Sequence, residues 1–179
     1  MSSRNGDPSS DKCIALLREQ GCSKEVLVHS QAVAELALAI AACIPAANPE
    51  IVRIGALLHD IGRSINHGFT HAALGADIIA QAGLPAHIVE IVRAHLGAGL
   101  TEKEAAALGL PPGDYMPRSL EARIVAQADN LIGGTKRRTL EKIIKKYRKK
   151  GNETGAERIK ALHQELSALA GIDLDRIGD

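Results

Sequence analysis

Apolar residues recur at every third or fourth position along most of the chain, the spacing that places them on one face of an α-helix. Capping residues and breakers separate the segments: Ser23 can cap one long helix, and Pro45 and Pro49 end it. The pattern predicts helices over residues 13–20, 24–44, 49–60, 71–81, 85–95, 119–131, 139–149 and 153–170, with a short helix inside the glycine- and proline-rich segment 96–119. No stretch alternates convincingly as a strand. We expect an all-α, single-domain helical bundle.

Composition supports one domain with an aliphatic core. The 179 residues include no Trp, one Phe and two Tyr, so alanine, leucine and isoleucine must fill the interior. We expect a flexible N-terminus over residues 1–11, a helical domain over 12–135, and C-terminal helices over 136–179 that pack on the same domain. A net charge of +1 gives the molecule as a whole no strong bias toward nucleic acid or membrane.

The cysteines and the N-terminus favour the cytoplasm. Cys13, Cys22 and Cys43 are odd in number and form no CxxC pair, so reduced thiols are a simpler interpretation than disulfides. The N-terminal segment is polar and lacks the features of a signal peptide. The longest apolar run, residues 33–44, contains Glu35 and is too short to span a bilayer. We therefore expect a soluble cytoplasmic protein with no membrane partner.

Ionisable residues on the apolar faces of the predicted helices are the main chemical feature of the sequence. His29, for example, shares its face with Val33, Leu36 and Ile40. Four helices each direct one such group inward, and a fifth ends on two of them side by side. The full set is His29, His71, His95 and Asp129, with His59 and Asp60 at the end of the fifth helix.

The aspartates in this set are harder to explain than the histidines. A single inward histidine is most often a core residue satisfied by a backbone carbonyl, whereas an unpaired core carboxylate is strongly destabilising. The pattern places no lysine or arginine on these faces, so Asp60 and Asp129 need another cation. A divalent metal held by neutral imidazoles and carboxylates provides it. The alternative is a helical scaffold whose inward polar groups pair only with each other, and it predicts no bound metal.

The order of these residues resembles the HD-domain superfamily of metal-dependent phosphohydrolases, in its HDIG form. The signature of that family is a histidine, a His-Asp pair and a distant aspartate on a helical bundle, here His29, His59-Asp60 and Asp129. The resemblance makes residues 12–135 a metal-binding domain. Two further segments, HAALGADIIAQAGLP and IVRAHLGAG, look like members that hold two metals, which implies that His71 and His95 bind a second ion with Asp60 bridging. Small archaeal HDIG proteins with a GDYMP...ADNL segment are the most similar group.

The resemblance implies a metal-dependent phosphohydrolase that cleaves a phosphoester of a nucleotide or related phosphorylated compound, with metal-activated hydroxide as nucleophile. The ligand set contains no thiolate, which favours one or two ions of iron or manganese, with nickel, cobalt, magnesium and zinc as alternatives. Asp60 and Arg63 are the candidate catalytic residues. Arg63 would clamp a substrate phosphate, although an arginine at a helix end also stabilises the helix dipole. His67 is an alternative metal ligand to His71.

A basic segment occupies residues 136–150. It holds nine lysines and arginines against one acidic residue, Glu141, which leaves the rest of the chain net acidic. An apolar stripe that includes Ile143 and Tyr147 predicts an amphipathic helix with a solvated basic face. The functional alternative is a track for RNA or polyphosphate, because clustered lysines neutralise backbone phosphates. The matching alternative for the whole protein is a nucleotide- or RNA-binding module with weak or no hydrolase activity.

Overall fold

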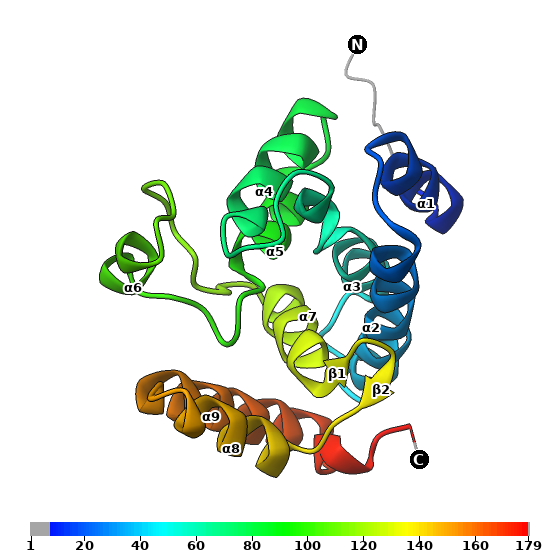
Figure 1. Cartoon of the computed structure of the whole chain (residues 1–179). Helices are drawn as coiled ribbons and strands as arrows, with labels where there is room; N and C mark the ends of the chain where they lie inside the picture. The colour runs from blue at the N-terminus through cyan, green and yellow to red at the C-terminus, as the bar shows by residue number, and fades with distance from the viewer. Residues whose placement is uncertain (1–7, 179) are drawn as a thin grey trace.

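The computed structural model describes residues 8–178 and is built almost entirely from helices, as predicted (Figure 1). Within these residues the helices are α1 (Ser10–Glu19), α2 (Lys24–Ala42), α3 (Pro49–Leu58), α4 (His71–Gln81), α5 (Ala86–Ala94), α6 (Glu102–Ala107), α7 (Leu120–Leu131), α8 (Leu140–Lys149) and α9 (Glu153–Ala170). Two 3₁₀ turns, η1 (Ile61–Ser64) and η2 (Leu174–Arg176), and one antiparallel pair of short strands, β1 (Ile132–Gly133) and β2 (Lys136–Arg137), were not predicted. The all-α fold class is confirmed.

Capping residues that the sequence carries fix most helix starts. The side chains of Ser23 and Asn48 accept hydrogen bonds from the first turns of α2 and α3. Thr101 and Glu104 form a reciprocal capping box at the start of α6. At the N-terminus the structure differs from the prediction, because α1 begins at Ser10 and so includes the last two residues of the expected flexible segment. The first seven residues of that segment lie outside the described part of the chain.

One aliphatic cluster holds the bundle together. α2, α3 and α7 pack against one another; α5 packs on α3 and α7 and carries α4, while α8 and α9 cover the other side of α7 (Figure 1). Ile40, Leu58 and Ile124 are fully buried in this cluster, and Ile143 of α8 and Ile159 of α9 belong to it as well. Each such side chain contributes about 1.5–3 kcal/mol on burial. The C-terminal helices therefore share their core with the rest of the bundle.

α2 is the one helix of residues 8–178 that is long and apolar enough to cross a membrane by length and composition alone, with a mean hydropathy of 1.4. A core helix of a soluble protein passes the same test. α2 packs along α3 and α7, and Val33, Ala37 and Ile40 are fully buried between them. These contacts account for the apolar face of α2 within the bundle.

His163 joins the C-terminal turn to the bundle. The side-chain amide of Gln127 lies 3.1 Å from His163 Nδ1, and His163 Nε2 lies 3.0 Å from Asp173 Oδ1. Both ring nitrogens of this buried histidine thus have partners inside the protein. Asp173 also caps η2 by accepting a hydrogen bond from the backbone N–H of Asp175. His163 is therefore a core histidine with a structural role.

Gly62 allows η1 to lie directly against α4. The sequence predicts a helix through Asp60 that the glycine ends, but α3 ends earlier, at Leu58, and Gly62 lies within η1. A Cβ at Gly62 would overlap the carbonyl oxygen of His71 and lie 2.6 Å from the backbone nitrogen of Gly75. The missing side chain, rather than an unusual backbone angle, is what this position requires. The close approach brings the start of α4 next to Asp60.

We expect Gly62→Ala to lower the free energy of unfolding by about 3 kcal/mol or more, because two rigid backbone segments must separate to admit the methyl group. Urea denaturation of the purified chain measures this. The matched control is Gly83→Ala, where a Cβ meets nothing within 4 Å and the only cost, about 1 kcal/mol, is the positive φ. Equal losses in the two variants would contradict the packing argument.

Candidate metal centre

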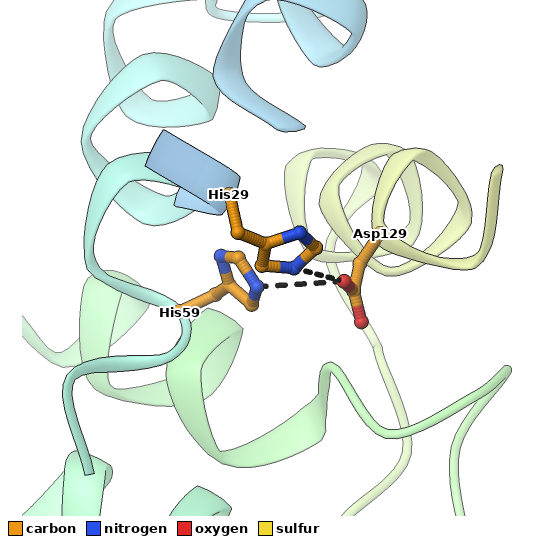
Figure 2. Close-up of side chains that lie close together, drawn as sticks. All are labelled: His29, His59 and Asp129. Atoms are coloured by element: carbon orange, nitrogen blue, oxygen red, sulfur yellow. Dashed lines mark hydrogen bonds and ion pairs between the residues drawn. The ribbon is translucent and has the colours of Figure 1, made fainter. Parts of the chain in front are cut away.

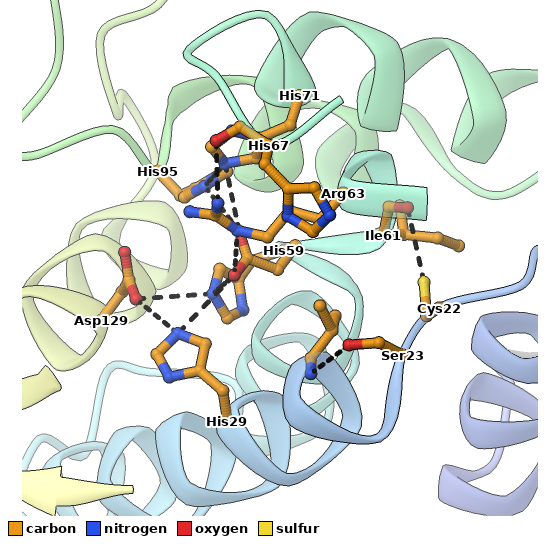
Figure 3. Close-up of polar contacts among 12 residues, drawn as sticks. Cys22, Ser23, His29, His59, Ile61, Arg63, His67, His71, His95 and Asp129 are labelled. Carbon is orange, nitrogen blue, oxygen red and sulfur yellow. Dashed lines mark hydrogen bonds and ion pairs between the residues drawn. The ribbon is translucent and has the colours of Figure 1, made fainter. Parts of the chain in front are cut away.

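The six residues predicted to bind metal lie together in the middle of the bundle. Figure 3 labels the four histidines and Asp129. They come from His29 on α2, His59 and Asp60 directly after α3, His71 at the start of α4, His95 at the end of α5, and Asp129 on α7. Four of them, His59, Asp60, His71 and His95, expose 3% of their surface or less. Five separate helices thus converge on one buried polar cluster inside an otherwise aliphatic core.

All four histidines of the cluster are oriented by the same kind of hydrogen bond. In each ring Nδ1 donates to a backbone carbonyl, and the bonds join His29 to Gly134 (2.7 Å), His59 to Ala56 (2.7 Å), His71 to Gly68 (2.6 Å) and His95 to Val92 (2.7 Å). A neutral imidazole that donates through Nδ1 has its free lone pair on Nε2. The four Nε2 atoms face the interior of the cluster. Carbonyl groups that fix the ring in this way are typical of metal-binding histidines.

Asp60 lies between two pairs of these histidines. Its Oδ1 is 3.1 Å from His71 Nε2 and 3.5 Å from His95 Nε2. Its Oδ2 is 3.6 Å from His59 Nε2 and 3.7 Å from His29 Nε2. One carboxylate therefore presents one oxygen to each pair, which is the arrangement that a bridging ligand between two ions requires.

Asp129 completes the group on the side of His29 and His59 (Figure 2). Its Oδ1 lies 3.0 Å from His29 Nε2 and 3.5 Å from His59 Nε2. The side chain of Asp129 is 24% exposed, while that of His59 is fully buried. This side of the cluster consequently has two imidazoles, two carboxylates and a path to solvent.

The arrangement of the donor atoms favours a bound divalent cation over direct contacts among the donor atoms themselves. The Nε2 atoms of His71 and His95 are 2.9 Å apart, so their lone pairs repel unless a cation or a proton lies between them. At metal–nitrogen distances of 2.0–2.1 Å, two ligands at a right angle lie about 3 Å apart. His59 Nε2 and Asp60 Oδ1 are buried and have no hydrogen-bond partner. An unsatisfied buried atom costs about 1–3 kcal/mol, which a bound ion would recover.

The charges of the cluster also favour a cation. Burial raises the pKa of Asp60, but the neighbouring rings of His59, His71 and His95 outweigh it and hold this pKa well below the usual range. Asp129 behaves in the same way, with a lowered pKa, through His29 and His59. Burial lowers the pKa of His59, yet the two carboxylates raise it to about 9. Both carboxylates therefore remain ionised and attract positive charge to the point where the histidines meet.

Arg63 turns back toward the cluster, which corrects one step of the sequence argument. Its Nε lies 2.6 Å from Asp60 Oδ2, so Asp60 does have an inward cation. The reason is η1, whose tight turn places the residue three positions after Asp60 over the carboxylate. Asp129 and Asp60 Oδ1 receive no such partner among the described arginines and lysines, and they still need a cation.

The structure distinguishes between His71 and His67, the two candidates for one metal ligand. His71 is 2% exposed and faces Asp60, whereas the His67 side chain is exposed in the loop before α4 (Figure 3). The contribution of His67 is its backbone carbonyl, which accepts a hydrogen bond from Arg63. His71 is thus the histidine that the structure places in the cluster.

A cavity of about 810 Å³ opens beside the cluster, and His29, His95, Asp129 and Arg63 are part of its wall. Eight further wall residues were not predicted to lie at the site: Phe69, Leu108, Arg138, Lys142, Lys146, Tyr147, Lys150 and Arg158. The four-residue spacing of the lysines was visible in the sequence. Their position was not, because nothing in the local pattern specifies where α8 docks.

The glycine- and proline-rich segment 96–119 is anchored at the edge of this cavity. Asn130, next to Asp129, donates a hydrogen bond of 2.8 Å to the carbonyl of Gly97. Farther along, Arg158 of α9 forms an ion pair with Glu104 of α6 at 2.9 Å. The hydrogen bond from Asn130 fixes the chain just after His95 and thereby supports the position of that histidine.

The chain is similar to a known domain family and to a solved structure with the same fold. The model of the HD domain family matches residues 26–134. Uncharacterized protein MJ0778 of Methanocaldococcus jannaschii is 43% identical over 165 residues, which cover 89% of this chain and 97% of that protein. A phosphodiesterase PgpH HD domain of L. monocytogenes, solved in complex with cyclic-di-AMP, has the same fold, with a TM-score of 0.56 and 22% identity over 86% of this chain and 94% of that one.

Two longer relatives have names from RNA biology. A tRNA (cytidine(56)-2'-O)-methyltransferase of Thermoplasma volcanium is 47% identical over 95% of this chain, and the chain spans 50% of that protein. A ribonuclease Y of Chloroflexus aurantiacus is 33% identical over 83% of this chain and 26% of that protein. The chain thus spans half or less of these two proteins, and their similarity concerns the helical region described above.

We expect His59→Ala to lower metal affinity by about 100-fold or more, since loss of a ligand should exceed the 10–100-fold effect of losing a group that orients one. Inductively coupled plasma mass spectrometry of the untagged chain gives the metal content. His163→Ala is the matched control, because it removes an equally buried histidine that lies outside the cluster. It should lower stability by about 1–3 kcal/mol and leave the metal content unchanged. The assignment fails if the two variants retain metal equally.

Proposed function

The chain belongs to the HD domain family, and on that premise we propose that it is a metal-dependent phosphohydrolase acting on a phosphoester of a nucleotide or related phosphorylated compound. The observation that carries the proposal is the convergence of four Nε2 atoms and two carboxylates on one buried point. Two of those atoms, His59 Nε2 and Asp60 Oδ1, are buried without a hydrogen-bond partner among the described residues, and their nearest polar neighbours are other members of the cluster. A scaffold held by polar pairs alone would have no reason to leave them unsatisfied.

The cluster divides into two candidate sites that share Asp60. His29, His59, Asp60 and Asp129 would hold one ion, and His71 and His95 with Asp60 would hold a second. Bound divalent metal would lower the pKa of a water and neutralise charge on phosphoryl oxygens. Nitrogen and oxygen donors without a thiolate favour iron or manganese. In hydrolysis the water oxygen bonds to phosphorus, the bond to the leaving ester oxygen breaks, and that oxygen takes up a proton.

The position of Arg63 supports a role in binding a substrate phosphate. Its guanidinium lies beside Asp60 and forms part of the cavity wall, with a side chain that is 31% exposed. A guanidinium can bond a carboxylate and still present N–H groups to a phosphate, since it carries five donors in a planar fork. The helix-dipole role that the sequence also allowed fits less well, because Arg63 lies in η1, beyond the end of α3.

A binding module with weak or no hydrolase activity is the second candidate function. The observation that favours it is the 47% identity to half of a protein named as a tRNA methyltransferase, a name that describes a different reaction. In such a protein a helical unit could serve to hold RNA. The complete ligand set argues for hydrolysis, since binding alone does not need six converging metal donors.

Asp129→Asn should reduce kcat/KM for bis(p-nitrophenyl) phosphate by about 100-fold or more in manganese- or iron-loaded protein, because the amide removes a negative donor from the cluster. Asp77→Asn serves as the matched control, as Asp77 is 61% exposed and pairs with Arg93 on the surface. Absence of phosphoesterase activity in the metal-loaded wild type, on both monoester and diester probes, would favour the binding module.

Arg63→Lys should raise KM for the same diester by about tenfold with metal content unchanged, because lysine keeps the charge but loses the two-pronged contact. Steady-state kinetics and metal analysis on the same preparation measure both quantities. If KM stays constant while metal is lost, Arg63 positions Asp60 and does not bind phosphate.

A further inference from the structure

One wall of the cavity is a row of basic side chains on one face of α8 and at its two ends. Lys142, Lys146 and Lys150 line the cavity at four-residue spacing, and Arg138, four residues before Lys142, lines it as well. On an α-helix this spacing places side chains above one another, about 6 Å apart along the axis. The three lysines therefore extend over about 12 Å. These four residues form what we call the basic row.

The basic row begins next to the metal centre. The Arg138 guanidinium covers Gly133, where a Cβ would overlap it. The following residue, Gly134, provides the carbonyl that orients His29. Because the Gly133–Gly134 turn holds both groups, the first charge of the row and the first histidine of the cluster are neighbours in the same cavity wall.

The charges of the row have no paired carboxylate in the described part of the chain. Over residues 8–178 no carboxylate forms an ion pair with any of its four members. Burial lowers the pKa of Lys146, and the positive charges of Arg138 and Lys150 lower it further. By contrast, Arg148 on α8 does not line the cavity and is paired with Glu153 and Glu157. The face of α8 that lines the cavity thus carries positive charge that no described carboxylate pairs, whereas Arg148 on another face is paired.

We propose that the basic row binds successive phosphates of a single-stranded nucleic acid whose end enters the metal centre. The inference rests on the proposed function for its chemistry, and it names the substrate class as an oligonucleotide rather than a free nucleotide. Successive phosphates of a strand are separated by a sugar, so a strand can follow the lysines over their span of about 12 Å. The phosphates of a triphosphate share single bridging oxygens and therefore extend over a much shorter distance. The cavity, at about 810 Å³, has room for one or two nucleotides and excludes a duplex.

Phe69 and Leu108 supply an apolar surface in the same cavity. Their side chains are 54% and 37% exposed, and both line the wall that also contains Arg63 and His95. A base can stack on an exposed aromatic ring beside a basic groove, whatever its sequence. The scarcity of aromatic residues in the chain therefore does not exclude base stacking at this site.

The test is fluorescence anisotropy of a short labelled oligouridylate on the full, metal-loaded chain, for two double variants. Lys142→Gln/Lys146→Gln removes two charges of the basic row. Lys145→Gln/Lys149→Gln removes two charges at the same spacing from the same helix, at positions outside the cavity wall. The row variant should raise Kd by about tenfold or more. It should also lower the slope of log Kd against log salt by about 1.4, because each lost contact to a single-strand phosphate lowers this slope by about 0.7. The control should change Kd by less than about twofold.

Equal weakening in the two double variants, or none in either, would overturn the basic row as a track. Displacement of the oligonucleotide by an equal concentration of inorganic tripolyphosphate would also overturn it, in favour of a short polyphosphate. Binding of oligothymidylate as well as oligouridylate supports the strand with either sugar, and binding of the ribose form alone supports RNA. Because these are binding measurements, they can succeed even if the diester assay shows that the proposed hydrolysis is absent, so the two failures are distinguishable.

Discussion

The buried carboxylate of Asp60 is the constraint on which the centre of this bundle depends. It lies among four imidazoles whose Nδ1 atoms are already committed to backbone carbonyls. Those bonds fix the free lone pairs on Nε2 and direct them at the carboxylate and at one another. Arg63 covers one carboxylate oxygen, but the other has no hydrogen-bond partner. The cluster is therefore satisfied only when positive charge occupies its interior.

The fold supplies this geometry through backbone contacts more than through long side chains. Histidine rings at the ends of α3 and α5 and at the start of α4 each bond a carbonyl three residues back, so position on the helix sets ring orientation. Gly62 lets η1 lie against α4, and Asn130 holds the segment after His95. Small local features thus place four Nε2 atoms from distant parts of the chain 3.1–3.7 Å from one carboxylate.

Helical periodicity was sufficient to predict the bundle and the inward direction of its ionisable residues, because both follow from spacing along one helix. It did not predict the ion pair between Arg63 and Asp60. That pair forms because the chain turns back through η1, and this turn depends on packing against α4. The lysines of α8 show the same limit. Their four-residue spacing is local, but their position beside His29 depends on how Ile143 and Tyr147 dock on the core. Tertiary placement, not propensity, was the missing information.

Diffraction from crystals grown with manganese, with data collected at the manganese absorption edge, tests the central claim most directly. We predict two anomalous peaks on either side of Asp60, one approached by the Nε2 atoms of His29 and His59 and the other by those of His71 and His95. Peaks absent from this cluster at full manganese loading, or histidines that bond Asp60 with no ion between them, would contradict the account.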